Sequence, residues 1–237
     1  ILNTYDYDMV QIFHKEIHDR GINLLIGEKI KKLENNKAYL SSGKIIDADA
    51  IVMAKGVVPN VSLAREAGLE IGETGAIKVD KNYRTSDKDI YAVGDAIEVY
   101  NALTHRTTKL ALAGPAQKEA HTVADHINNR VTSNKGFIGS SAIKVFDYNG
   151  ASTGLSESMI KSHNIVINYD IVRATLSDKV GLMPDSKPLH FKLLYEVPTG
   201  KVLGAQAIGK GDATKRIDVI ATVIKFNGTL DDLRDLE

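Results

Sequence analysis

The first apolar pattern in the chain is helical. Five side chains recur at helical spacing between residues 5 and 20 and share one stripe, namely Tyr5, Met9, Ile12, Phe13 and Ile17. Gly21 follows as a stop signal. Short apolar runs then predict strands over residues 22–26, 29–33, 37–40 and 45–53, with a hairpin turn at 41–43. The amino-terminal part is therefore expected to be an amphipathic helix followed by short strands.

Between residues 61 and 130 the pattern changes to short elements separated by turn residues. It predicts a short helix at 62–67 that Gly68 stops, a buried strand at 90–93, and a helix that begins at Pro115. One face of that helix carries only apolar side chains, namely Ala116, Ala120, Val123, Ala124 and Ile127. We expect this face to pack against the rest of the protein.

Residues 131–237 show strands first and a long helix later. Apolar side chains alternate over residues 189–196, a turn follows at 197–200, and a second strand returns over 201–209. A helix over 213–226 is predicted to be capped by Asp212, and Thr229 is predicted to cap a last helical piece, with Asp232 three residues on. This order predicts an α+β module.

Composition narrows the class of protein. The 237 residues are 43% hydrophobic, which is enough for a sizeable core, and 30 basic residues balance 30 acidic ones. Because the charges balance, the chain has no net positive charge that would attract nucleic acid or an acidic membrane, so neither is expected as a partner. No apolar run approaches the roughly 20 residues that span a bilayer, and the expected location is the cytoplasm.

The segment from Thr85 to Asp95 carries the clearest chemical signal. The predicted strand over 90–93 delivers Gly94 and Asp95 to its carboxyl end, where ligands of open α/β sheets bind. Glycine lets a ligand approach the backbone, and the aspartate can accept hydrogen bonds from hydroxyl groups.

A second segment, Leu112 to Gln117, complements the first. Gly114 and Pro115 are predicted to open a helix, so the free amides of its first turn point outward. Those amides and the helix dipole would stabilise electron density on a ring oxygen or nitrogen, as in a reduced isoalloxazine. Together the two segments indicate a flavin site.

These residues also carry a family resemblance. The chain resembles the carboxyl-terminal two thirds of a pyridine nucleotide-disulfide oxidoreductase, nearest to the coenzyme A-disulfide reductase and NADH oxidase branch. The matching stretches are residues 54–60, 75–80, 85–95, 112–117 and 204–209, in the family's order. The resemblance implies a homodimeric flavoenzyme that holds FAD, oxidises NAD(P)H, and reduces a small-molecule disulfide, persulfide, peroxide or oxygen.

The resemblance also implies a domain organisation. Residues 1–57 would be the second half of an NAD(P)-binding domain, residues 58–130 the second half of an FAD-binding domain, and residues 131–237 an α+β dimerisation domain. The expected fold class is α/β plus α+β, with partial Rossmann-like domains before a reductase dimerisation domain.

The resemblance assigns residues to the cofactor. Asp95, next to Gly94, would bind the ribityl chain, while Leu112, Ala113 and the helix start at Gly114, Pro115 and Ala116 would lie under the flavin ring. Gly56, in the crossover at 54–60, is also expected at the cofactor. No catalytic residue is expected within this chain.

Missing features keep alternatives open. The chain has no cysteine and neither of the two Gly-x-Gly-x-x-Gly fingerprints of the family, so a fragment is expected, with the redox cysteine upstream. A non-catalytic dimerising fragment with an incomplete flavin site is therefore the alternative. Leu182 and Met183 stand where coenzyme A-disulfide reductases carry tyrosines, so the electron acceptor stays open. A NAD-linked ferredoxin or rubredoxin reductase is a third possibility.

Overall fold

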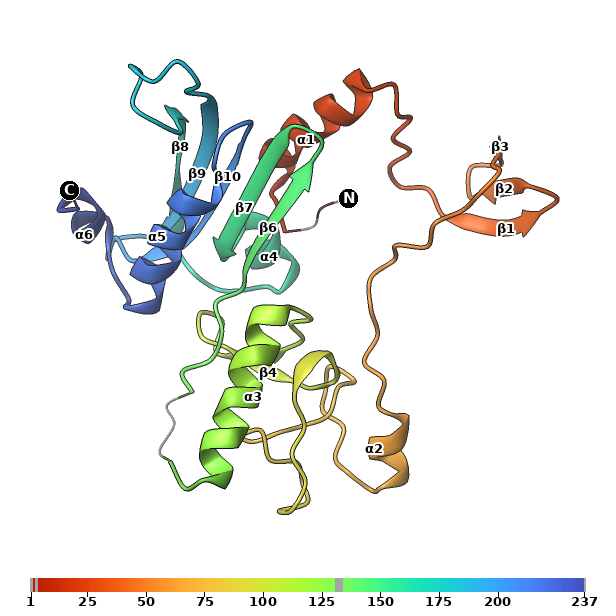
Figure 1. Ribbon diagram of the computed structural model, residues 1–237, viewed down its shortest axis with the longest axis vertical. Coiled ribbons are helices and arrows are strands. Elements are labelled where there is room, and N and C mark those ends of the chain that lie inside the picture. Colours follow the sequence, from red (N-terminus) through yellow and green to blue (C-terminus); the bar gives the residue numbers. More distant parts are fainter. Residues whose placement is uncertain (1, 3, 131–133, 237) are drawn as a thin grey trace.

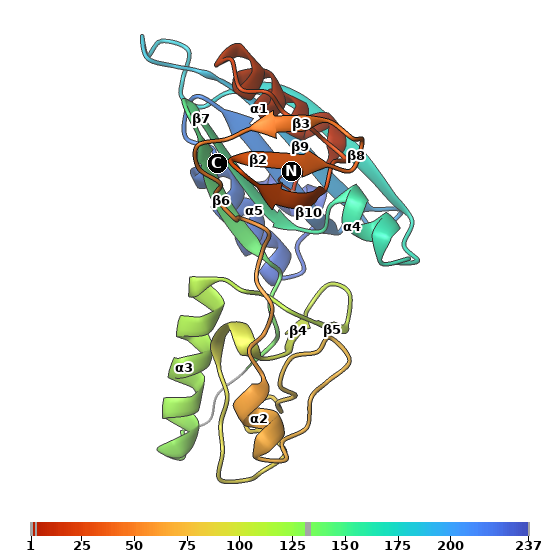
Figure 2. The same ribbon diagram turned by 90° about the vertical axis from the view of Figure 1, so that its right-hand side faces the viewer.

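The computed structural model describes residues 2, 4–130 and 134–236. A large β-sheet lies between helices α1 (Tyr7–Asp19) and α5 (Thr214–Lys225), and a separate lower part is built around α3 (Ala113–Ile127) (Figure 1). A small sheet of β1 (Ile30–Glu34), β2 (Lys37–Leu40) and β3 (Ile45–Asp47) projects to one side. An extended segment joins β3 to the lower part (Figure 2).

The large sheet is antiparallel, with strand order β6-β7-β10-β9-β8. Its strands are β6 (Ser140–Val145), β7 (Tyr148–Gly154), β8 (Tyr169–Ser177), β9 (Pro188–Glu196) and β10 (Val202–Gly209). The predicted hairpin is confirmed as β9 and β10. Every residue of β10 is buried, because this central strand is covered on both faces.

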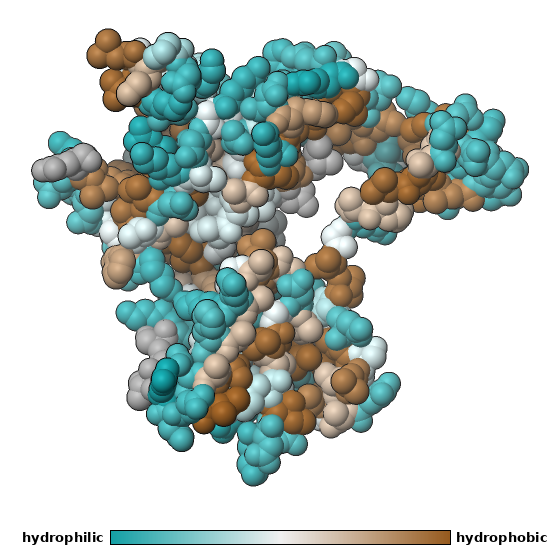
Figure 3. All heavy atoms as spheres, in the orientation of Figure 1, coloured by the Kyte–Doolittle hydropathy of each residue, from teal (hydrophilic) through white to brown (hydrophobic). Residues whose placement is uncertain are grey.

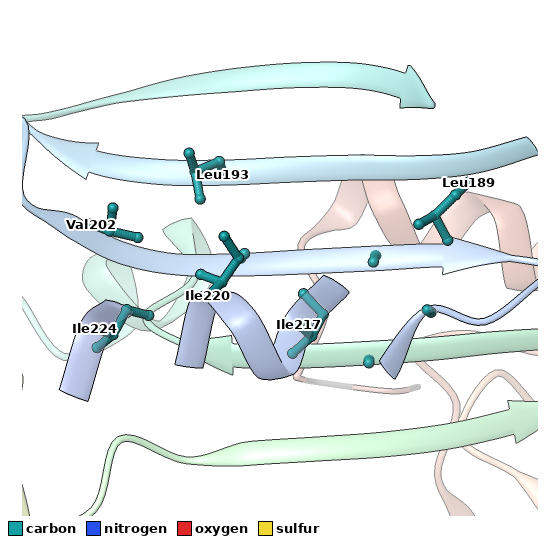
Figure 4. Close-up of a cluster of buried hydrophobic side chains, with 10 residues drawn as sticks. Leu189, Leu193, Val202, Ile217, Ile220 and Ile224 are labelled. Atoms are coloured by element: carbon teal, nitrogen blue, oxygen red, sulfur yellow. The ribbon is translucent and has the colours of Figure 1, made fainter. Parts of the chain in front are cut away.

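Helix α5 covers one face of the sheet. Ile217, Ile220 and Ile224 pack against Leu193 and Val202 of the hairpin (Figure 4). Asp212 Oδ1 accepts hydrogen bonds from the backbone N–H groups of residues 214 and 215, as the sequence predicts. Helix α6 (Leu230–Arg234) begins with a capping box between Thr229 and Asp232, which confirms the second predicted cap.

Helix α1 covers the opposite face. Met9, Val10 and Phe13 are buried against Ile208 of β10. Neighbouring positions of β10 therefore face different helices, since Ala207 packs on the α5 side. The predicted amphipathic helix is confirmed, and it encloses the sheet as an outer layer.

A charge cluster around the buried Lys192 ties the start of α1 to the sheet and to α4 (Glu157–Ser162). Lys192 of β9 is 0% exposed, and its Nζ lies 2.9 Å from Asp6, 2.9 Å from Asp8 and 2.6 Å from Glu157. Burial lowers the pKa of Lys192, but its hydrogen bonds to the three carboxylates outweigh this effect and hold the pKa above its usual value. The ammonium therefore stays charged inside the protein.

The lower part has its own small core. It contains α2 (Ser62–Glu66), the 3-10 turn η1 (Gly94–Ala96), β4 (Val99–Asn101), β5 (Arg106–Thr108) and α3. The buried side chains of this core are Ala64, Ile77, Tyr83, Ile97 and Val99. Among the residues described, parallel pairing in this part is limited to the isolated bridges Ile77–Ile97 and Asn101–Phe137.

Three strand predictions are wrong. Residues 22–26 form no strand, and the strand expected over 45–53 ends at Asp47. The expected buried strand at 90–93 is reduced to one bridge from Tyr91 to Arg84, and Ile90 and Val93 are 38% and 40% exposed. The physical reason is the same in each case. A strand needs a neighbour that pairs its backbone groups over several residues, and the described residues supply at most a single bridge there.

Two predictions about α3 also need correction. The helix begins at Ala113, two residues before Pro115, because any position of the first turn tolerates the missing N–H. The predicted apolar face is confirmed only in part: Val123 packs against the core of the lower part, whereas Ala120 and Ala124 are exposed and Ile127 is 60% exposed. Glu119 and Thr122 are buried instead, and each has a hydrogen-bond partner inside the protein.

Apolar side chains are exposed over the segment that follows β3. Val52 and Val58 are 89% and 88% exposed, and Figure 3 shows hydrophobic residues on the surface of the small sheet and of the lower part. None of the described helices is long and apolar enough to cross a membrane.

Candidate functional site

Gly94 and Asp95 lie in η1, on the surface of the lower part. Gly94 has a φ of +82°, and no atom lies within 4 Å of the position where a Cβ would stand. The space beside it is open, so a ligand could approach the backbone there. The carboxylate of Asp95 is exposed and has no hydrogen-bond or ion-pair partner among the described residues. It is therefore free to accept hydrogen bonds from a ligand.

The start of α3 supplies free donors. Leu112 is the N-cap residue with an extended backbone, and no side chain of the described residues caps the helix. The first backbone bond of the helix runs from Ala116 N to Leu112 O at 3.2 Å, so the N–H groups of Ala113 and Gly114 have no partner in the described parts of the chain. Pro115 has no N–H. Two free amides and the positive end of a 15-residue helix thus meet at one point.

Glu119 joins these two features. Its Oε2 accepts a hydrogen bond from Gly94 N at 2.6 Å, one helical turn after Pro115, and the residue is 1% exposed. This bond fixes η1 against α3. The Asp95 carboxylate and the free amides of α3 are consequently held on the same small part.

The Glu119 carboxyl is itself perturbed. Burial raises its pKa, the Gly94 hydrogen bond opposes that rise, and the nearby charge of Asp95 adds to it. Tyr83 lies close enough for Glu119 to act on it, and burial together with that carboxylate raises the pKa of Tyr83 to about 12. The sequence interpretation missed Glu119. A charged residue four positions after Pro115, within an alanine-rich helix, was the signal that could have indicated it.

Gly56 lies elsewhere. It has a φ of +90° and open space at its Cβ position, within the extended segment that runs apart from α3 in Figure 1. The structure therefore brings residues 94–95 and 112–116 to one small part but does not bring Gly56 to them. Its place at the cofactor stays a prediction.

A cavity of about 300 Å³ opens beside the approach to α3. Residues 108–112 form one wall, and Phe137, Ser141, Ser152 and Met159 contribute to the others. It lies where the lower part meets the large sheet. A small molecule could therefore reach the side of the site that leads into Leu112.

Comparison with known families assigns the chain. Residues 1–120 match the family described as pyridine nucleotide-disulphide oxidoreductase, and residues 140–236 match the dimerisation domain of the same family. The chain belongs to the pyridine nucleotide-disulphide oxidoreductase family. This confirms the resemblance, the fold class and the predicted cofactors, FAD and NAD(P)H, at the level of the family, and the second match supports the expected homodimer. The boundaries at residues 57 and 130 stay predictions.

Individual relatives agree with this assignment. A coenzyme A disulfide reductase of Staphylococcus epidermidis is 30% identical over 98% of this chain and 52% of its own length. Reduced CoADR-RHD of Bacillus anthracis is 40% identical with a TM-score of 0.95, covering 99% of this chain and 42% of that one. An NAD-dependent persulfide reductase from A. fulgidus is 34% identical with a TM-score of 0.93, covering 98% and 44%. The chain thus spans about half the length of these relatives.

Proposed function

We propose that this chain supplies one side of the FAD site, part of the NAD(P)H-binding region and the dimer surface of an FAD-dependent NAD(P)H oxidoreductase. The expected acceptor is a small disulfide, persulfide, peroxide or oxygen. One observation carries the proposal. The free carboxylate of Asp95 and the free amides of Ala113 and Gly114 are held on one small part by the hydrogen bond between Gly94 and Glu119.

The residues fit a flavin in charge and in shape. When bound, FAD supplies the redox chemistry between a pyridine nucleotide and the acceptor. Asp95 would accept hydrogen bonds from the ribityl hydroxyls, and the amides of residues 113 and 114 would stabilise negative charge on the ring. Gly114 leaves open space at its Cβ position, so Leu112 to Ala116 could lie flat under the ring.

The acceptor class follows from chemistry that lies mostly outside these residues. The chain has no cysteine, so a disulfide-reducing member of the family needs a thiol that these 237 residues do not provide. Two relatives act, by name, on coenzyme A disulfide and on persulfide. Leu182 and Met183 are exposed and carry no hydroxyl, so this stretch offers no proton donor to a thiol product. We therefore propose the electron acceptor only as a class: a small disulfide, persulfide, peroxide or oxygen.

Flavin binding and turnover test the proposal together. The purified chain is expected to bind FAD, and Asp95→Ala should weaken binding about tenfold to a hundredfold, the loss of one or two hydrogen bonds to a charged group. Asp89→Ala is the matched control, because Asp89 is an exposed aspartate of the same loop that pairs with Lys88. NADH oxidation is then measured with coenzyme A disulfide, a persulfide, hydrogen peroxide and oxygen. Equal affinity in both variants would remove Asp95 from the site.

The second candidate is a dimerising chain without catalysis. The observation that favours it is the lack of both glycine fingerprints, which would cradle the cofactor pyrophosphate. This candidate predicts that the purified chain is colourless, sediments as a dimer and does not oxidise NADH. A yellow protein with stoichiometric flavin would exclude it.

A further inference from the structure

A second hollow lies between the β4–β5 hairpin and α4, next to the cavity beside the approach to α3, with which it shares four lining residues, Lys109 among them. Its volume is about 330 Å³, and it is lined by Arg106, Lys109, His163 and four threonines. We call it the Arg106 pocket. Figure 2 shows α4 above the hairpin, so the pocket lies between the lower part and the part that contains the large sheet.

The charged residues that line the Arg106 pocket are all basic. Among the described residues, no aspartate or glutamate lines the pocket, and neither Arg106 nor Lys109 has a carboxylate oxygen within 4.0 Å. Over the whole chain 30 basic residues balance 30 acidic ones, so a hollow whose charged residues are all cations differs from the average charge of the chain. Another basic hollow, around Lys144 and Lys210, differs because Asp178, Asp185 and Asp212 also line it.

The guanidinium of Arg106 is held in place. Arg106 Nη1 donates to the backbone oxygen of His163 at 2.8 Å, at the carboxyl end of α4. That bond uses one of five N–H donors and leaves the remainder for a ligand. Arginine presents those donors as a rigid fork that matches the oxygens of phosphate.

One residue of the pocket wall, Thr74, has a buried hydroxyl that is not used within the described structure. The Oγ1 of Thr74 is shielded from solvent and has no hydrogen-bond partner in the described structure. A buried polar group without a partner is uncommon and often marks a missing ligand or water. A neighbouring carboxylate, that of Glu98, accepts a hydrogen bond from Thr74 N at 2.8 Å and lines the adjacent hollow.

We propose that the Arg106 pocket binds a phosphate group, either as inorganic phosphate or as the phosphomonoester of a small metabolite. Arg106 and Lys109 would supply the charge, and the threonine hydroxyls would donate to the remaining phosphate oxygens. The volume exceeds that of phosphate alone and lies at the lower end of small-molecule sites, which favours an ester with a small organic group. The inference does not depend on flavin binding.

The test is calorimetric titration of the full chain at constant ionic strength set with potassium chloride. The probes are inorganic phosphate, 3′-AMP and adenosine. Binding of phosphate and 3′-AMP but not adenosine is expected, and tighter binding of 3′-AMP than of phosphate would identify the ester as the source. Arg106→Gln should weaken binding about tenfold to a hundredfold. Arg65→Gln, an exposed arginine of α2 outside the pocket, should leave it unchanged.

A second variant separates binding from folding. Arg106→Gln also removes the bond to α4, whereas the Nζ of Lys109 makes no hydrogen bond within the described structure. Lys109→Gln should therefore keep the wild-type melting temperature and still weaken phosphate binding. No heat above the chloride control, or an equal loss in Arg65→Gln, would overturn the proposal.

Discussion

The hydrogen bond between Glu119 and Gly94 gives the sharpest prediction about the site. Two substitutions separate its parts. Glu119→Gln keeps a carbonyl oxygen that can accept from Gly94 N and removes the charge. Glu119→Leu removes the acceptor and leaves the Gly94 N–H facing an apolar side chain at a position that is 1% exposed.

The magnitude follows from the loss of one buried acceptor. A buried donor left without a partner costs about 1–3 kcal/mol. For a chain of this size each kcal/mol lowers the melting temperature by about 2–4 °C. We expect Glu119→Leu to melt about 2–12 °C below Glu119→Gln at pH 7.5. Since both variants lack the charge, the difference isolates the hydrogen bond.

The charge of Glu119 has a separate effect, on the pH dependence of stability. Because burial raises the folded-state pKa of Glu119, its contribution to stability is complete below the unfolded pKa and is lost as pH rises through the folded value. Glu119→Gln should therefore match the wild type near pH 4 and be at least as stable at pH 7.5. Thermal unfolding followed by circular dichroism measures both. Equal melting of the Leu and Gln variants would refute the role given to this bond.

Three further predictions concern the rest of the fold. Lys192→Met leaves Asp6 buried without its cation and should lower the free energy of unfolding in urea by about 3–5 kcal/mol. Lys15→Met, at an exposed ion pair, should lower it by under about 1 kcal/mol. Similar losses in the two variants would contradict the role given to Lys192. Hydrogen bonds hold the pKa of Asp6 and Asp8 below their usual values despite burial, so stability should fall below about pH 3.9, and Lys192→Met should flatten that fall in an acid titration. Thr229→Ala removes the capping box of α6 and should cost about 1 kcal/mol by chemical denaturation, with an unchanged value counting against the cap.

The carboxyl-terminal part was the most predictable from sequence. The alternation over 189–196 and the turn at 197–200 depend on neighbours within a few residues, and the caps at Asp212 and Thr229 are local hydrogen bonds. Strand order was not accessible in this way. The pairing of β10 with β7 joins residues 50 to 60 positions apart, from Gly204 with Gly154 to Gly209 with Asn149.

The local geometry of the candidate site could be expected from the sequence, but the contact that joins its parts could not. The positive φ of Gly94, the exposed carboxylate of Asp95 and the free amides at the start of α3 follow from residue type and local chemistry. Their role at the cofactor stays a prediction. The bond from Gly94 to Glu119 could not be expected, because it joins η1 to a residue of helix α3 that lies 25 positions later. The face of α3 was predicted only in part for the same reason. A hydrophobicity pattern assigns Glu119 to solvent, whereas a specific partner allows it to be buried.

The central claim is that a flavin binds where η1 meets the start of α3. The most direct measurement is a titration of the ¹⁵N-labelled chain with FAD, followed by backbone amide shifts. The account predicts that the largest changes fall on Gly94, Asp95, Ala113 and Gly114, and that Asp95→Ala reduces them at equal FAD concentration. Changes centred on other parts of the chain, with these four amides unmoved, would contradict it.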